Sequence, residues 1–271
     1  MKTHDDIDPT ATASAIHRFN RYEIKYLMPQ ASLPELRARL ASRMAVDSNT
    51  GGKPERVGSL YYDTRDLRFY WEKIEGLRFR RKLRIRAYGD PETIDGDTTV
   101  FVEIKQRTNR VTQKRRIALP YRHARTLCDG RPVPEDANVR PAFSNEVLTM
   151  VASLDLQPTA VTTYLREPYI GIDADIGMRI TLDHRVCGRD RDFDLSMPST
   201  NRFLIPQHLA IVEIKANERV PTWFTDLAAE LELTTVRISK YCKAIEAHAD
   251  GIRSGLYSRH EPDSGIRSKG A

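Results

Sequence analysis

Two short segments of the chain carry the same alternation of acidic, basic and apolar residues. The sequence reads Phe-Val-Glu-Ile-Lys at 101–105 and Ile-Val-Glu-Ile-Lys at 211–215. Side chains of a β-strand alternate between two faces, so each segment predicts one apolar face and one face with a glutamate and a lysine. Carboxylates in such strands can hold Mg²⁺ or Mn²⁺, and the cations beside them can bind phosphates that share the metal.

Arginine and lysine repeat this alternation in other predicted strands. The charged faces carry Arg21, Glu23 and Lys25; Lys82, Arg84, Arg86 and Tyr88; Glu103, Lys105 and Arg107; Arg179, Thr181, Asp183 and Arg185; and Glu213 and Lys215. For one strand alone, a solvent-exposed face is the simpler interpretation. Together these faces are mainly cationic, and like charges opposite one another repel unless an anion lies between them. Guanidinium and ammonium groups suit a chain of phosphates better than a flat base.

The remaining pattern predicts the elements that position these residues. Short alternating runs predict strands at 19–27, 60–63, 77–88, 99–107, 111–119, 160–166, 169–174, 177–186 and 210–217. Helices are predicted from a capping box at Ser32–Glu35 with an apolar stripe to Met44, at 144–156, around 223–231 and at 237–248. We therefore predict an α+β fold: a closed antiparallel β-barrel of about eight strands, with a charged lumen and helices packed outside. A dry cationic lumen would cost several kcal/mol per ion, so it must hold water and a polyanion.

Composition agrees with this prediction. The 271 residues are 40% hydrophobic and 30% charged with a net charge of +6, which is typical of a globular protein with an anionic partner. Cys128, Cys187 and Cys242 match neither a disulfide framework nor a metal motif, so we expect free thiols. No apolar run reaches the length of a membrane span, and the N-terminus lacks a signal peptide, so we expect a cytoplasmic protein. We expect one domain over 16–248, with disordered polar segments at 1–15 and 249–271.

An ordered set of motifs resembles a known family. The motifs are Lys25, Arg84-x-Arg86, Glu103-x-Lys105, Tyr164-x-Arg166, Arg179, Glu213-x-Lys215 and Ser239-Lys240-Tyr241-x-Lys243. In this order, over roughly 17–247, they resemble the VTC domain, the polyphosphate polymerase domain of the vacuolar transporter chaperone complex and its stand-alone bacterial relatives. That family belongs to the triphosphate tunnel metalloenzymes and is related to the CYTH triphosphatases.

The resemblance implies a role for each matching residue. The catalytic cations would be Lys25, Arg84, Arg86, Lys105, Arg166, Arg179, Lys240 and Lys243. Further phosphate contacts would come from Lys82, Lys114, Tyr164, Lys215 and Ser239. The metal, Mn²⁺ or Mg²⁺, would be held by Glu213 and Glu103, with Glu23 and Asp183 as further candidates. The ligands would be ATP and polyphosphate, pyrophosphate or triphosphate. The register of Lys114 is open at this stage, because a slip of one residue would turn Arg115 inward instead.

One departure separates the branches of this superfamily. CYTH triphosphatases begin with Glu-x-Glu-x-Lys, whereas this chain has Arg21 in place of the first glutamate, which favours transfer of phosphate along a chain over hydrolysis. Two alternatives remain: a triphosphatase of the same fold, and a module that binds polyphosphate or another polyanion without catalysis. We expect no nucleic-acid partner, because Tyr61, Tyr62, Tyr70 and Trp71 lie outside the charged strands. We also expect no membrane segment within the chain, so any membrane association would need a separate membrane protein partner.

Overall fold

The structure is a computed structural model that describes residues 21–47, 53–109, 111–134, 139–217 and 219–248. The predicted polar segments 1–15 and 249–271, and the first residues of the predicted strand 19–27, lie outside this range. Within it, no helix has both the length and the hydrophobicity of a membrane span.

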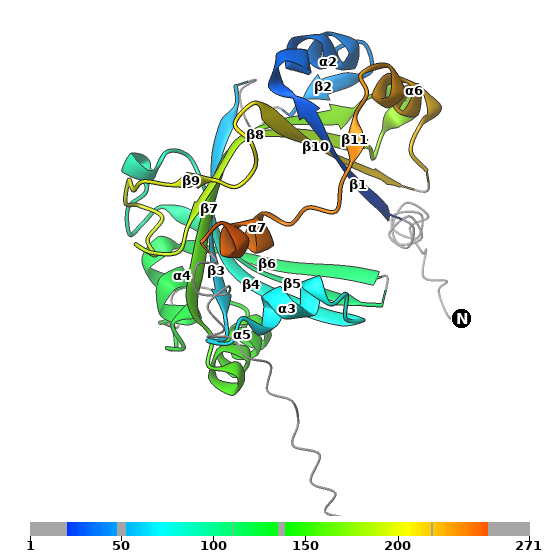
Figure 1. Ribbon diagram of the computed structural model, residues 1–271. Coiled ribbons are helices and arrows are strands. Elements are labelled where there is room, and N and C mark those ends of the chain that lie inside the picture. The colour runs from blue at the N-terminus through cyan, green and yellow to red at the C-terminus, as the bar shows by residue number, and fades with distance from the viewer. Residues whose placement is uncertain (1–20, 48–52, 110, 135–138, 218, 249–271) are drawn as a thin grey trace, which may run out of the picture.

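One curved antiparallel sheet organises the molecule (Figure 1). Its strands are β1 (Arg21–Pro29), β2 (Met44–Val46), β3 (Glu55–Asp63), β4 (Phe79–Tyr88), β5 (Thr99–Thr108), β6 (Val111–Pro120), β7 (Gln157–Gly171), β8 (Arg179–Arg189), β9 (Arg202–Phe203), β10 (Leu209–Asn217) and β11 (Thr234–Thr235). Neighbours follow the order β11-β1-β10-β8-β7-β3-β4-β5-β6, with β2 beside β7 and β9 beside β8. The runs predicted as separate strands at 160–166 and 169–174 form the single strand β7.

The sheet is not the closed barrel of about eight strands that the sequence predicts. It has eleven strands in the described residues, and no backbone pairing joins β6 to the other end of the path. The free edge of β1 is partly occupied by β11, through the pairs Tyr26↔Thr235 and Leu27↔Thr234. Side chains approach across the opening instead, since Lys105 Nζ on β5 lies 3.7 Å from Glu23 Oε2 on β1.

The helices are α2 (Leu33–Leu40), α3 (Arg68–Ile74), α4 (Tyr121–Cys128), α5 (Pro141–Leu154), α6 (Thr222–Glu230) and α7 (Lys240–Ala247), with short 3₁₀ turns at Gln30–Ser32, Pro91–Thr93 and Asp173–Asp175. The sequence patterns did not predict α3 and α4. Met44, predicted as part of the first helical stripe, lies in β2 because α2 ends in a turn in which the Arg43 N–H donates to the Leu40 carbonyl. The Ser32 hydroxyl makes no capping hydrogen bond there.

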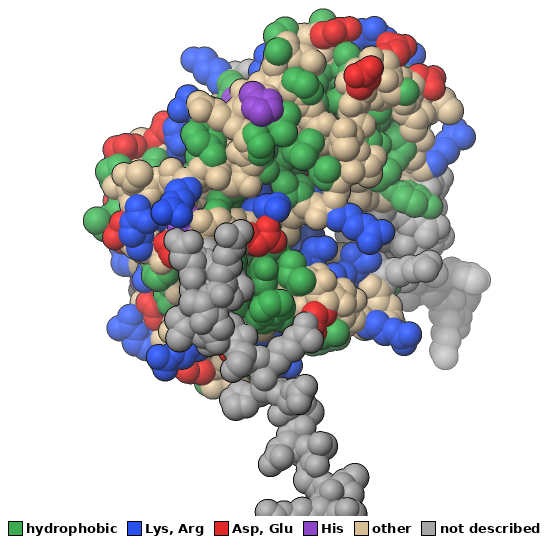
Figure 2. Space-filling model, in the orientation of Figure 1, with side chains coloured by type: hydrophobic (Ala, Val, Ile, Leu, Met, Phe, Trp, Pro, Cys, Tyr) green, Lys and Arg blue, Asp and Glu red, His purple; other side chains and the backbone are tan. Residues whose placement is uncertain are grey.

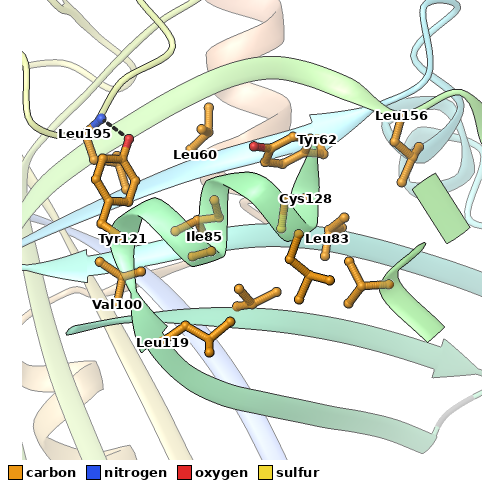
Figure 3. Close-up of a cluster of buried hydrophobic side chains, with 14 of the residues drawn as sticks. Leu60, Tyr62, Leu83, Ile85, Val100, Leu119, Tyr121, Cys128, Leu156 and Leu195 are labelled. Atoms are coloured by element: carbon orange, nitrogen blue, oxygen red, sulfur yellow. Dashed lines mark hydrogen bonds between the residues drawn. The ribbon is translucent and has the colours of Figure 1, made fainter. Parts of the chain in front are cut away.

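Four of the helices cover the convex face of the sheet, in two separate hydrophobic cores. One core packs α4 and α5 against β3, β4 and β5, and the other packs α2 and α6 against β1, β8 and β10. Figure 3 shows the first core, where Leu83 and Ile85 of β4 lie beside Cys128 of α4. The Leu195 N–H donates to the Tyr121 hydroxyl at 2.9 Å, and this hydrogen bond holds the loop between β8 and β9 against α4. Each buried aliphatic side chain contributes roughly 1.5–3 kcal/mol, so the convex face supplies much of the stability.

The last helix lies on the other side of the sheet. We expected all helices outside the barrel, but α7 lies within the curve of the sheet (Figure 1). Its side chains Tyr241, Cys242 and Ile245 are buried in a third core. On the strands this core includes Tyr61, Tyr164 and Ile211, which belong to the concave face. The concave face is therefore divided into an apolar part under α7 and a charged part beside it.

Candidate functional site

The charged part of the concave face collects charged side chains from seven strands and from α7. We call it the cationic groove and define it by Glu23, Lys25, Lys82, Arg84, Arg86, Glu103, Lys105, Lys114, Arg166, Asp183, Glu213, Lys215 and Lys240. In the space-filling view, Lys and Arg side chains gather in a hollow beside α7 (Figure 2). Alternation places them there, because Leu83 and Ile85 between the β4 cations, and Val212 and Ile214 beside Glu213, lie in the convex cores.

Glu103 on β5 is the centre of the first charge cluster. It is 1% exposed, and it accepts a hydrogen bond from Arg84 Nε at 2.7 Å. Lys114 Nζ lies 2.5 Å from its other oxygen. Burial alone would raise the pKa of Glu103, but Arg84, Arg86 and Lys114 outweigh it and lower this pKa to about 2. The pairing Lys105↔Lys114 turns Lys114 into the groove and Arg115 outward to Glu146, which settles the register that the sequence left open.

Asp183 on β8 is the centre of the second cluster. Arg166 forks onto it, with Nε and Nη2 donating at 2.6 and 2.7 Å, and Lys240 Nζ donates at 2.6 Å. Burial opposes ionisation, but the two cations dominate and lower the pKa of Asp183 to about 2. The buried ring of Tyr164 lies against both cations, 5.1 Å from the Arg166 guanidinium and 4.4 Å from the Lys240 ammonium. The cluster thus connects α7 to β7 and β8.

Glu213 and Glu23 share the third cluster. Lys25 Nζ lies 3.3 Å from Glu213 and 3.2 Å from Glu23, and Lys215 also pairs with Glu213. Burial would lower the pKa of Lys25, but the two carboxylates raise it above its ordinary value. For Glu213, burial is opposed by Lys25 and Lys215, which hold its pKa well below the ordinary value. In this cluster one cation, Lys25, contacts two carboxylates.

Three predicted residues lie at the border of the groove or serve another contact. Arg179 pairs with Asp47 at 3.1 Å, opposite Lys215 on the sheet. Lys243, predicted on the same helical face as Lys240, pairs instead with Glu246 at 2.7 Å and is 42% exposed. The Ser239 hydroxyl caps α7 by accepting from the Cys242 N–H, and it also accepts from Lys82 Nζ at 3.0 Å.

The remainder of the lining contains lysines that lie opposite one another and an arginine without a carboxylate partner among the described residues. Lys82 lies directly opposite Lys105, and Lys105 lies directly opposite Lys114. Burial lowers the pKa of Lys82 and that of Lys105, and neighbouring cations add to the effect. Arg86 is buried, with Nε donating to the Ser59 hydroxyl at 3.3 Å, and no carboxylate of the described residues lies within ion-pair distance of it. Like-charged pairs in this arrangement destabilise a sheet unless an anion binds between them.

Sequence reasoning missed several residues of this surface. Tyr61 is buried and accepts a hydrogen bond from Arg84 Nη1 at 2.9 Å. Burial raises its pKa, but Arg84, Arg86 and Lys82 lower it further, to about 8. Arg80 and Arg116 were also missed, although by parity they share the face of the predicted cations, as does Arg107, which the alternation had already placed there.

The arrangement of the carboxylates limits how a divalent metal could bind. No group of three or more His, Cys, Asp or Glu side chains in the described residues is arranged to hold one. Mg²⁺ is commonly bound through one or two carboxylates together with substrate phosphates. Glu213 and Glu23 fit that mode, because both contact Lys25 and neither is held by a guanidinium fork. Glu103 and Asp183 fit it less well, since arginine engages both.

Two further predictions concern side chains outside the groove. Tyr61, Tyr62 and Tyr70 are 6%, 1% and 6% exposed, so they offer no exposed stacking platform for bases. All three cysteines are free, with Cys128 and Cys242 buried and Cys187 only partly buried.

The fold and the site together describe a class of protein with a curved antiparallel sheet and a cationic groove on its concave face. The VTC domain profile matches residues 20–248, and the chain belongs to this family. Among curated proteins, the chain is 27% identical to vacuolar transporter chaperone complex subunit 4 of Trypanosoma cruzi and 26% identical to that of Trypanosoma brucei brucei. Each alignment covers 92% of this chain but only 37% of the relative.

Solved structures with a similar course of the chain have low identity. An adenylyl cyclase candidate of Hippeastrum, described as having a dominant triphosphatase activity, is 13% identical with a TM-score of 0.47, over 85% of this chain and 96% of that one. An adenylate cyclase candidate of Bacillus halodurans is 13% identical with a TM-score of 0.46, over 82% and 96% of the two chains.

Proposed function

We propose that the chain is a polyphosphate polymerase, which transfers the γ-phosphate of ATP to the end of a polyphosphate chain held in the cationic groove. The observation that carries the proposal is the excess of cations over carboxylates there, including the directly opposed lysines Lys82, Lys105 and Lys114. Membership of the VTC family supports it, since the resemblance of the motifs implies this activity.

The reaction requires positioning more than covalent catalysis. Phosphoryl transfer proceeds through a loose, in-line transition state, so cations that hold donor and acceptor and spread the charge suffice. Arg84 and Arg166 are held by Glu103 and Asp183. Lys82 and Arg86 have no carboxylate within ion-pair distance among the described residues, so they can contact phosphate oxygens. An oxygen of the terminal phosphate of the chain attacks the γ-phosphorus of ATP, the bond to the β-phosphate oxygen breaks, and ADP leaves.

Glu213 and Glu23 would hold Mn²⁺ or Mg²⁺ in this scheme. The metal would neutralise charge on the nucleotide phosphates. Lys25, which both carboxylates contact, would then be released to bind phosphate itself. The cytoplasmic location and a membrane protein partner remain parts of this proposal.

The test is to incubate the pure protein with ATP and Mn²⁺ and to separate the products on a gel. Formation of long phosphate chains would indicate a polymerase, and release of free phosphate would indicate a triphosphatase. If neither product forms, the protein is a binding module. Glu213→Gln keeps the shape of the side chain and removes its charge. We expect it to lower ATP turnover by roughly a hundred-fold or more while triphosphate binding survives. Equal turnover by the variant and the wild type would show that Glu213 does not hold the metal.

A further inference from the structure

A second pair of like charges lies beyond the groove on the same two strands. Arg80 on β4 is directly opposite Arg107 on β5, one step past the pair Lys82↔Lys105. Opposed residues of antiparallel strands have Cβ atoms about 4.5–5.5 Å apart, and the next pair on the same face lies about 6.7 Å further along. The two pairs therefore form a ladder of four cations that leads away from the groove.

Parity and electrostatics place the arginine pair on the concave side. Arg80 shares the face of Lys82 and Arg84, while Arg81 between them belongs to the opposite face. The pKa of Lys73 on α3 is lowered, first by burial and then by Arg80, Lys25 and Arg107. Burial also lowers the pKa of Arg80, and Arg107 adds to the effect. Lys73 therefore lies near both arginines and near the groove residue Lys25.

Neither arginine has a carboxylate partner within ion-pair distance in the described part of the chain. The contact found for Arg107 is from its Nε to the carbonyl of Asn109 at 3.0 Å. A directly opposed pair of arginines without counter-ions is destabilising. In the lysine pair beside it, Lys105 has Glu23 at 3.7 Å, whereas Lys82 has no carboxylate within ion-pair distance among the described residues. Two such pairs in succession fit an extended anion that runs along both strands.

We propose that Arg80 and Arg107 form an outer subsite of the cationic groove, which binds phosphates of a polyphosphate chain beyond the three that a triphosphate offers. The subsite makes the protein select long chains over short ones. The inference rests on the proposed class of substrate, but not on catalysis, because binding alone expresses it.

The experiment compares affinities for inorganic triphosphate and for long-chain polyphosphate without ATP, by calorimetry at fixed ionic strength. The variants are Arg80→Gln and Arg107→Gln. The matched control is Arg81→Gln, which removes the same charge from the adjacent residue on the opposite face of β4. We expect each test variant to bind long chains roughly ten-fold more weakly, since a charge-assisted contact is lost, with triphosphate affinity unchanged. The control should retain both affinities.

Several results would overturn the outer subsite. It fails if the wild type binds both ligands equally, if the test variants keep the wild-type affinity for long chains, or if they lose affinity for both ligands alike. If Arg81→Gln lost as much affinity for long chains as the test variants, the effect would come from net charge and not from the subsite. Melting curves confirm that each variant is folded, and Arg107→Gln carries the test if Arg80→Gln is not. Because no turnover is needed, a protein that makes no polyphosphate from ATP still gives a decisive result.

Discussion

The two parts of the concave face share strands and differ in what covers them. Under α7 the strands β3, β7 and β10 present Tyr61, Tyr164 and Ile211 to buried side chains of the helix. A few residues away, β7 and β10 present Arg166 and Glu213 to the groove, and β4, the neighbour of β3, presents Arg84. The apolar part is completed by the chain itself, whereas the charged part still contains repelling pairs. One part of the face thus stabilises the fold, and the other, in the proposed function, binds phosphates at a cost in stability.

The largest expected effect is on the apolar part. Tyr241→Ala removes a side chain that is 2% exposed and whose hydroxyl donates to Asp63. We expect a loss of about 3–5 kcal/mol in the free energy of unfolding, as for other buried aromatic residues. Urea unfolding measures it, with Tyr22→Ala as the control because Tyr22 is 50% exposed. If both variants unfold alike, α7 does not complete the concave core.

Triphosphate should act on the charged part in the opposite direction. Binding at about 100 times the dissociation constant adds about 2.7 kcal/mol to the free energy of unfolding and raises the melting temperature. Thermal melts with triphosphate, and with sodium chloride at the same ionic strength, separate specific binding from screening. An unchanged melting temperature at saturating triphosphate would contradict the proposal that the groove binds an anion.

Removal of one opposed lysine should separate stability from binding. Lys82→Met keeps the length of the side chain and removes the repulsion between Lys82 and Lys105. We expect the unliganded protein to be unchanged or about 1 kcal/mol more stable, because an uncompensated buried charge is lost. We expect triphosphate affinity to fall roughly ten-fold. Arg122→Met on the convex helix α4 is the control and should change neither quantity by a comparable amount. A clear loss of stability in Lys82→Met would place this lysine among the stabilising residues.

The smallest expected effect is a titration at the border of the two parts. The pKa of Tyr61 is lowered to about 8, so one tyrosine should ionise near pH 8. Because the pKa is lower in the folded protein than in the unfolded chain, this ionisation stabilises the fold as the pH rises from about 8 to about 10. Ultraviolet absorbance of tyrosinate measures the step, and Tyr61→Phe should abolish it. Triphosphate should move the step to higher pH, since it neutralises the cations that lower the pKa. A step that persists in Tyr61→Phe would assign it to another tyrosine.

The motifs chosen from the sequence converge in the structure to different degrees. Lys25, Arg84 and Glu213 lie in the groove as predicted, because a strand fixes the face of each side chain by local backbone geometry alone. Lys243 does not converge with Lys240, since its partner Glu246 lies one turn further along the same helix. The helices α3 and α4 were missed because each is short and follows a strand closely, so that neither shows a long periodic pattern.

The sequence by itself determined which side chains share a face, and with it the cationic character of the groove, because strand alternation is a local property. Tertiary structure alone decided the pairing Lys105↔Lys114, which turns Lys114 rather than Arg115 inward, since register depends on a neighbouring strand. It also decided that the sheet stays open beside β11 and that α7 fills part of the concave face. Those outcomes depend on packing between segments far apart in the chain, for which a local pattern carries no signal.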